Sequence, residues 1–110
     1  MHYFIELWNP TQLWRSLPTA DRQDYIEQVA AATASLVDQG VEILTWSVNA
    51  SEVSQRASYQ YFAIWKFPTL ELAQAFQDTV AGAGWYRYFD QLNLLGEQDS
   101  AQNILQALAA

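Results

Sequence analysis

Two periodicities of hydrophobic residues divide the chain into predicted strands and helices. Apolar residues that alternate with polar ones indicate half-buried strands, and apolar residues spaced three and four apart indicate one face of a helix. β-Branched and aromatic residues further mark the strand segments. The predicted strands cover residues 2–8, 41–49, 59–67 and 91–97, and the predicted helices begin at Thr19 and Thr69, with a short third helix over residues 99–110.

Capping residues and glycines set the expected ends of the helices. Thr19 and Thr69 each follow a proline at the position where an N-cap belongs, and Gly40 and Gly82 supply the stops. Residues 9–18 read as a connector with one helical turn, and Asp99 or Ser100 caps the C-terminal helix. The expected inner faces are Ile26, Val29, Ala30, Thr33, Leu36 and Val37 in the first helix, Leu72, Ala73, Phe76 and Val80 in the second, and Ile104, Leu105 and Leu108 in the third.

The order strand–helix–strand occurs twice with equal spacing. Thr19 lies 22 residues before Val41 (41 − 19), and Thr69 lies 22 residues before Gln91 (91 − 69). Two such units predict a single α+β domain over residues 1–110 with the ferredoxin-like order β-α-β-β-α-β. We therefore expect one four-stranded antiparallel sheet with two helices on one face, followed by the short C-terminal helix.

The predicted strands are apolar on both sides of the sheet. Two helices cover only one side, so an aromatic uncovered side would be an aggregation hazard in a monomer. A second copy that packs sheet to sheet about a two-fold axis would cover this side, and we expect a homodimer. In the first strand Tyr3, Ile5 and Leu7 oppose His2, Phe4, Glu6 and Trp8, and in the third Phe62 and Ile64 oppose Tyr59, Tyr61, Trp65 and Phe67.

Charge and composition exclude several classes of function. Twelve acidic residues against five basic ones give a net charge of −7, which disfavours nucleic acid and membrane surfaces as partners. The absence of cysteine and the presence of one histidine exclude thiol catalysis and multi-histidine metal sites. No residue spacing suggests a metal, flavin or other cofactor. The start MHYFIELW lacks the basic and apolar regions of a signal peptide, so we expect a cytoplasmic protein.

Four segments together resemble a known superfamily over nearly the whole chain. The segments YFIELW, GVEILTWSVNAS, YQYFAIWKFP and GWYRYFDQLNLLGE are similar to those of a small bacterial family within the dimeric α+β barrels. The resemblance implies two ferredoxin-like subunits packed sheet to sheet, each with a pocket between sheet and helices. Relatives in that superfamily include antibiotic-biosynthesis monooxygenases, haem-degrading enzymes, EthD-like proteins, muconolactone isomerase and stress-responsive barrels. The second helix lacks the histidine of the haem-degrading members.

Glu6 and His2 are the candidate acid–base residues. Glu6 interrupts an apolar strand, and a buried carboxylate needs hydrogen-bond partners or a raised pKa. It is either a general base in a pocket or a structural acceptor for a tyrosine or tryptophan donor, and the sequence does not separate the two. His2 shares its strand face, but its place beside the first residue is more typical of an exposed histidine.

Aromatic residues gather near a glycine pair and predict a ligand pocket. Gly82 and Gly84 let the second helix stop and bend, so that the rings after them can cover the space between helix and sheet. Each ring alone is more typical of core or interface, and Asn49 alone of a strand-end turn, but the group as a whole indicates a pocket. The expected ligand-binding residues are Trp8, Trp46, Asn49, Tyr61, Trp65, Trp85 and Tyr86.

Two functions from different classes are compatible with this pattern. One is a small-molecule-binding, non-catalytic barrel in which Glu6 and Asn49 are structural hydrogen-bonding groups. The other is a cofactor-independent monooxygenase or isomerase for a small aromatic or polyketide-like substrate, with Glu6 and His2 handling the proton. The shortage of acid–base residues favours the first, and whether the chain is an enzyme stays open.

Overall fold

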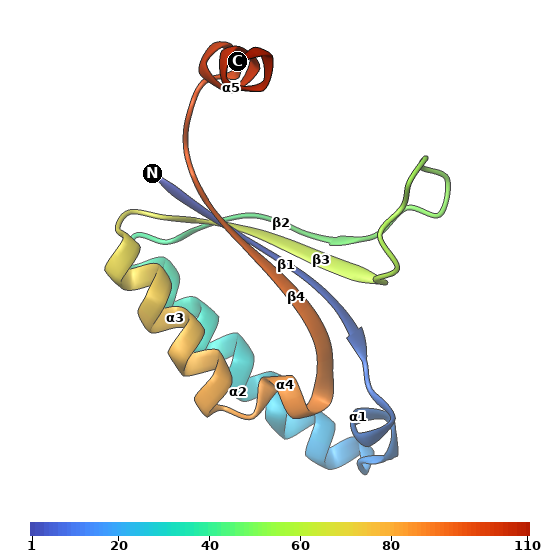
Figure 1. The fold of residues 1–110 in the computed structure, drawn as a ribbon. Helices are drawn as coiled ribbons and strands as arrows, with labels where there is room; N and C mark the ends of the chain where they lie inside the picture. Colours follow the sequence, from blue (N-terminus) through green and yellow to red (C-terminus); the bar gives the residue numbers. More distant parts are fainter.

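Four antiparallel strands form one open sheet in the order β2-β3-β1-β4, in a computed structural model that describes all residues from 1 to 110 (Figure 1). Five helices accompany the sheet, which makes the chain an α+β protein. The elements in chain order are β1 His2–Pro10, α1 Gln12–Ser16, α2 Thr19–Asp38, β2 Glu42–Val48, β3 Tyr61–Phe67, α3 Leu70–Gly82, α4 Trp85–Tyr88, β4 Phe89–Glu97 and α5 Ala101–Ala109.

The helix starts follow the capping residues with one exception. Thr69 is the N-cap of α3, where its hydroxyl accepts from the backbone N–H of Leu72, and Ser100 caps α5 in the same way. The prediction that Thr19 caps the first long helix is wrong, because Pro18 occupies the N-cap position and Thr19 is the first helical residue. Proline has no side-chain acceptor, so this helix start lacks a side-chain cap.

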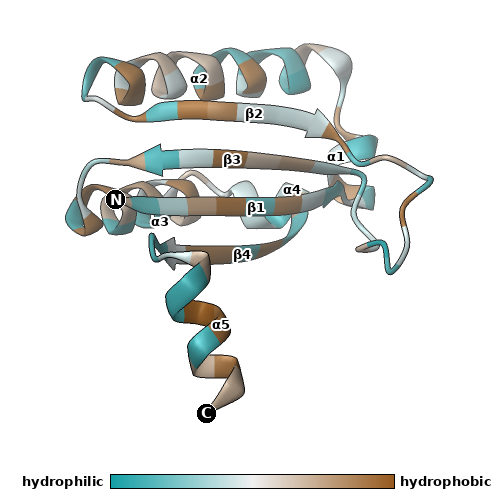
Figure 2. Ribbon diagram, turned by 90° about the horizontal axis from the view of Figure 1, so that it is seen from above, coloured by the Kyte–Doolittle hydropathy of each residue, from teal (hydrophilic) through white to brown (hydrophobic).

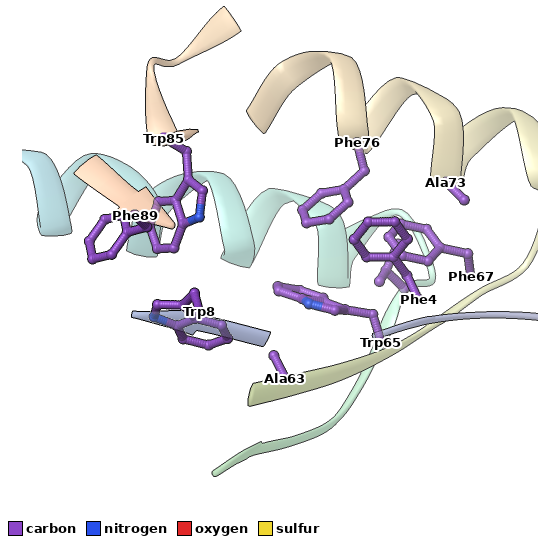
Figure 3. Packing of buried hydrophobic residues seen from close by; sticks show 10 residues of the cluster. Phe4, Trp8, Ala63, Trp65, Phe67, Ala73, Phe76, Trp85 and Phe89 are labelled. Carbon is purple, nitrogen blue, oxygen red and sulfur yellow. The ribbon is translucent and has the colours of Figure 1, made fainter. Parts of the chain in front are cut away.

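The core lies between the sheet and the helices on one of its faces. The registers place Phe4, Glu6 and Trp8 of β1 on the same side as Ala63, Trp65 and Phe67 of β3, in agreement with the predicted strand faces. Phe76 of α3 reaches down onto this side, while Trp85 and Phe89 cover Trp8 (Figure 3). The buried hydrophobic residues are Phe4, Trp8, Val41, Ala63, Trp65, Phe67, Ala73, Phe76, Trp85 and Phe89.

Helix α2 contributes less to the core than its sequence pattern predicts. None of its residues is buried, and Ile26 and Val37, two members of the expected inner face, are exposed. Two predicted members of the inner face, Val29 and Leu36, do pack against the core, and Tyr25, which was not expected there, joins them. Figure 2 shows α2 along the outer side of edge strand β2. At this position the helix covers the sheet only in part, which is consistent with the exposure of Ile26 and Val37. The predicted inner face of α3 is confirmed, with Ala73 and Phe76 buried.

The opposite face of the sheet carries no helix. Figure 1 places α2, α3 and α4 on one side of the strands and leaves the other side open. The expectation of an aromatic uncovered side is wrong, because most rings point toward the helices and the open face is mainly aliphatic. Its apolar residues are Tyr3, Ile5, Leu7, Phe62, Ile64, Leu92 and Leu94.

The C-terminal helix stands apart from the rest of the chain. Helix α5 extends beyond strand β4 and away from the other helices (Figures 1 and 2). Its apolar side, formed by Ile104, Leu105 and Leu108, is exposed. None of the helices in the structure combines the length and the apolar character needed to cross a bilayer.

Candidate ligand-binding cavity

A cavity of about 370 Å³ lies between helices α2 and α3, above the sheet. It exists because α2 lies at the sheet edge, which leaves a gap between the two helices that small side chains such as Ala32 and Ala75 do not fill. Glu6, Trp46 and Trp85 line it from the sheet and from α4. The walls are Tyr25, Gln28, Val29, Ala32, Thr33, Ser35, Leu36 and Gln39 from the α2 side and Leu72, Ala75, Phe76, Thr79, Val80 and Ala83 from the α3 side.

Glu6 is the one charged residue of this lining, and only 5% of it is exposed. Its Oε1 accepts a hydrogen bond of 2.6 Å from the indole Nε1 of Trp65. Its Oε2 accepts one of 2.8 Å from the amide Nε2 of Gln91, whose own Oε1 accepts from Trp85 Nε1 at 2.6 Å. The carboxylate is thus held by two neutral donors, and Gln91 joins it to Trp85.

The indoles at the two ends determine the direction of every hydrogen bond in this network. An indole N–H is a donor only, so Trp85 must face the carbonyl oxygen of Gln91, and Trp65 must face an acceptor oxygen of Glu6. The amide nitrogen of Gln91 is then left to donate to Glu6 and, at 2.7 Å, to Asn93 Oδ1. Both Glu6 oxygens therefore serve as acceptors, which is the role of an ionised carboxylate.

Burial and hydrogen bonding act on the Glu6 pKa in opposite directions. Burial disfavours the charged form and raises the pKa above its usual 4.5, while the hydrogen bonds from Gln91 and Trp65 lower it and offset part of the rise. The pKa of Tyr25, the other titratable residue of the lining, is also raised, first by burial and then by the neighbouring Tyr88. Tyr25 donates its hydroxyl to the backbone oxygen of Ala83 and so ties α2 to the end of α3.

The glycine pair places Trp85 as predicted. Helix α3 ends at Gly82, and Gly84 adopts a left-handed φ of 78°, which turns the chain into the short helix α4. Trp85 then enters the cavity lining and stacks on Phe89 with ring centroids 4.0 Å apart. Tyr86 points elsewhere: it is exposed, outside the lining, and accepts a hydrogen bond from Asn93 Nδ2.

Three of the residues expected at the site line the cavity, namely Glu6, Trp46 and Trp85. Two more support it from below. Trp65 is buried and donates to Glu6, and Trp8 is buried with its ring 5.2 Å from Trp46 and 6.1 Å from Trp85. These five residues therefore form one connected group on the helix-facing side of the sheet.

The other four expected residues lie away from the cavity. His2 is on the same strand face as Glu6 but four residues away, about 13 Å at about 3.3 Å per residue, with buried Phe4 between them. Asn49 donates its amide to the backbone oxygens of Ala57 and Tyr59, a loop-closing role. Tyr61 packs on Trp8, and Tyr86 is the exposed residue described above.

Gln91, Asn93 and Tyr25 belong to the site but were not predicted. Gln91 and Asn93 share a face of β4, opposite Trp8 and Glu6 in the register, and this pairing is not visible in the sequence. The available signal is the alternation of these two amide side chains with Leu92 and Leu94 in the strand. Tyr25 lies one residue before Ile26, where the expected inner face of α2 begins, so the sequence pattern does not place it on that face.

The donor set of the cavity suits an organic ligand. No group of three or more His, Asp and Glu side chains that could hold a metal ion is present in the structure. The lining combines aromatic and aliphatic side chains with a single carboxylate and a few neutral amides and hydroxyls. Such a mixture is typical of a small-molecule pocket.

Comparison with known proteins assigns the chain to a family. Residues 1–110 match the model of DUF6616, a family of unknown function, and the chain belongs to this family. A search of curated proteins finds no match to the chain.

Proposed function

For this member of a family without an assigned function, we infer that the chain is a small-molecule-binding protein whose ligand occupies the cavity between α2 and α3. The observation that carries this proposal is the cavity of about 370 Å³, whose largely apolar lining contains aromatic rings and one buried carboxylate. Its volume falls in the range of about 300–1,000 Å³ usual for ligand pockets. The Gln91 network supports the proposal because it fixes Glu6 in position before any ligand arrives.

A cavity-filling variant tests this function. Ala75→Trp places an indole in the space from the α3 wall, and N-phenyl-1-naphthylamine, a neutral dye that fluoresces in apolar sites, reports occupancy. We expect the variant to bind the dye at least about tenfold more weakly than the original chain, because the ring occupies the ligand's space. The control, Leu94→Gln on the open sheet face, should bind the dye normally. Loss of binding in the control with retention in Ala75→Trp would place the dye on the sheet and refute the pocket.

The fold proposed for this function is the ferredoxin-like dimeric α+β barrel. In the strand order β2-β3-β1-β4, the parallel strands β1 and β2 flank β3, and β3 and β4 flank β1, which matches two interleaved split β-α-β units. The exposed aliphatic face supports the dimer, because a second copy would remove Leu92 and Leu94, 56% and 59% exposed, from water.

An enzymatic function is the second candidate, and Glu6 is the observation that favours it. A buried carboxylate with a raised pKa beside a cavity is suited to act as a general base in a cofactor-independent monooxygenase or isomerase. The cavity offers no second acid–base residue beyond Tyr25, because His2 lies outside the lining. The binding function therefore accounts for more of the site than the catalytic one.

A further inference from the structure

The geometry points to an organic monocation with an apolar body, such as a protonated amine carrying a ring, as the ligand of the cavity, with Glu6 as its counter-charge. This inference rests on the small-molecule-binding function proposed above and specifies the ligand's chemical class. Three observations carry it: the unpaired charge of Glu6, the free acceptor capacity of its oxygens, and the aromatic residues that line the same cavity.

Glu6 has no positively charged partner within the chain. Its two hydrogen-bond donors, Trp65 and Gln91, are neutral. No lysine, arginine or histidine lines the cavity. A buried carboxylate of this kind is costly to keep ionised, and a cation that enters the cavity would supply the missing opposite charge.

The hydrogen-bond network leaves Glu6 able to accept more donors. Each carboxylate oxygen can accept two hydrogen bonds, and each has one protein donor in this structure. Trp65 and Gln91 can only donate to it, as the direction of the network requires. Because Glu6 lines the cavity, its free acceptor sites are available to a ligand there. A ligand with N–H donors can hydrogen-bond to these sites, whereas a ligand carboxylate is repelled by the charge of Glu6.

Aromatic rings surround the same space. Tyr25, Trp46, Phe76 and Trp85 all line the cavity, and the Tyr25 and Trp85 rings lie nearly parallel with centroids 6.4 Å apart. Ring faces attract cations within about 6 Å of the centroid, and tryptophan is the strongest of them. The net charge of −7 adds a long-range attraction for cations. The apolar walls from α2 and α3 accommodate the uncharged body.

Calorimetric titration with three ligands of similar shape tests the inference. The probes are 2-phenylethylamine as the cation, 2-phenylethanol as the neutral analogue and phenylacetate as the anion, each measured at pH 8. We expect the amine to bind at least about tenfold more tightly than the alcohol, because it makes a charge-assisted hydrogen bond, and we expect phenylacetate not to bind.

Two variants and a control connect the preference to the site. Glu6→Gln should remove the advantage of the amine while leaving the alcohol's affinity within about threefold, whereas Glu52→Gln, which removes an exposed loop charge, should preserve the advantage. Trp46→Leu keeps Glu6 and alters an edge-strand residue that is 46% exposed, so it tests the ring faces even if Glu6→Gln fails to fold. Trp46→Leu should reduce the affinity for the amine several-fold more than the affinity for the alcohol.

The outcomes separate this inference from the function on which it rests. Equal affinity for amine and alcohol in the original chain would overturn the cation class and leave small-molecule binding in place. No binding of any probe at millimolar concentration, together with an unaltered dye signal in Ala75→Trp, would overturn both. An equal loss of amine and alcohol binding in Trp46→Leu would overturn the role given to the ring faces.

Discussion

Glu6 shows how one residue acquires chemistry from its neighbours. In the strand pattern it is a polar interruption, and in the structure it is a buried carboxylate held by Trp65 and Gln91. Burial raises its pKa and the two donors oppose that rise. The side chain is therefore more basic than a surface glutamate and also fixed in place, and these two properties serve either an ionic contact with a ligand or proton transfer.

The raised pKa predicts a stability difference that depends on pH. Between the unfolded value near 4.5 and the higher folded value, the native state holds the Glu6 proton more tightly than the unfolded chain does. Glu6 therefore stabilises the folded state by its full amount below pH 4.5, and this stabilisation is lost as pH rises through the folded pKa.

Urea unfolding of the original chain and of Glu6→Gln from pH 4 to 8 measures this contribution. The free energy of unfolding of the original chain, minus that of the variant, should fall with rising pH and then level off. Glu52→Gln is the matched control. The free energy of unfolding of the original chain minus that of Glu52→Gln should change little with pH, because Glu52 is exposed. A difference that rises with pH would show that the folded state lowers the Glu6 pKa.

At the scale of elements, the junction between α3 and α4 decides whether Trp85 reaches the cavity. The two glycines of this junction have different roles. Gly84 has a φ of 78°, where a side chain is strained, whereas Gly82 is helical, and a methyl group added to its Cα would have no atom within 4 Å. Around Gly84 the nearest atom to such a methyl is Arg87 Cδ at 3.9 Å, so its cost is conformational and not steric.

Alanine at these two positions should change stability in opposite directions. Gly84→Ala should destabilise the protein by about 1–2 kcal/mol, because it forces an L-residue into the left-handed region. Gly82→Ala should stabilise it by up to about 1 kcal/mol through higher helix propensity. Chemical denaturation measures both changes, and each variant is the other's control. A loss of stability in both would mean that close packing, rather than backbone conformation, requires glycine here.

At the scale of the molecule, the two faces of the sheet have different surroundings. The helix-facing side holds the rings and the cavity, and the open side holds an aliphatic patch that no other part of the chain covers. Contiguous apolar patches on soluble proteins commonly mark interfaces. The proposed homodimer would cover this patch without closing the cavity, which lies on the other side of the sheet.

Sedimentation velocity at micromolar concentration tests the dimer. The original chain should sediment as a dimer, and the double variant Leu92→Gln with Leu94→Gln should sediment as a monomer, since it places two amides on the face that the dimer would bury. Val53→Gln removes an equally exposed apolar residue from the loop between β2 and β3, so that variant should remain a dimer. A monomeric original chain would refute the proposal.

Local sequence patterns determined the elements of this protein and the sides of its strands. Period-two alternation separated Phe4, Glu6 and Trp8 from Ile5 and Leu7, and the structure confirms this division. Proline, threonine and glycine placed the ends of α3, because capping and positive φ are properties of single residues. Glu6 stood out for the same kind of reason: a carboxylate within an apolar strand is a local anomaly.

Only the tertiary structure decided which residues meet at the cavity. A register shift between Ile43 and Thr45 leaves Leu44 as an irregularity in β2. As a result, Ile43 pairs with Trp65 and Trp46 pairs with Ala63, and both partners in β3 face the helices. In a regular strand, residues three apart point to opposite faces, and Trp46 would leave the cavity. The place of Gln91 beside Glu6 depends likewise on the pairing of β4 with β1. Strand register and the position of α2 at the sheet edge arise from contacts between distant segments, and no local pattern encodes them.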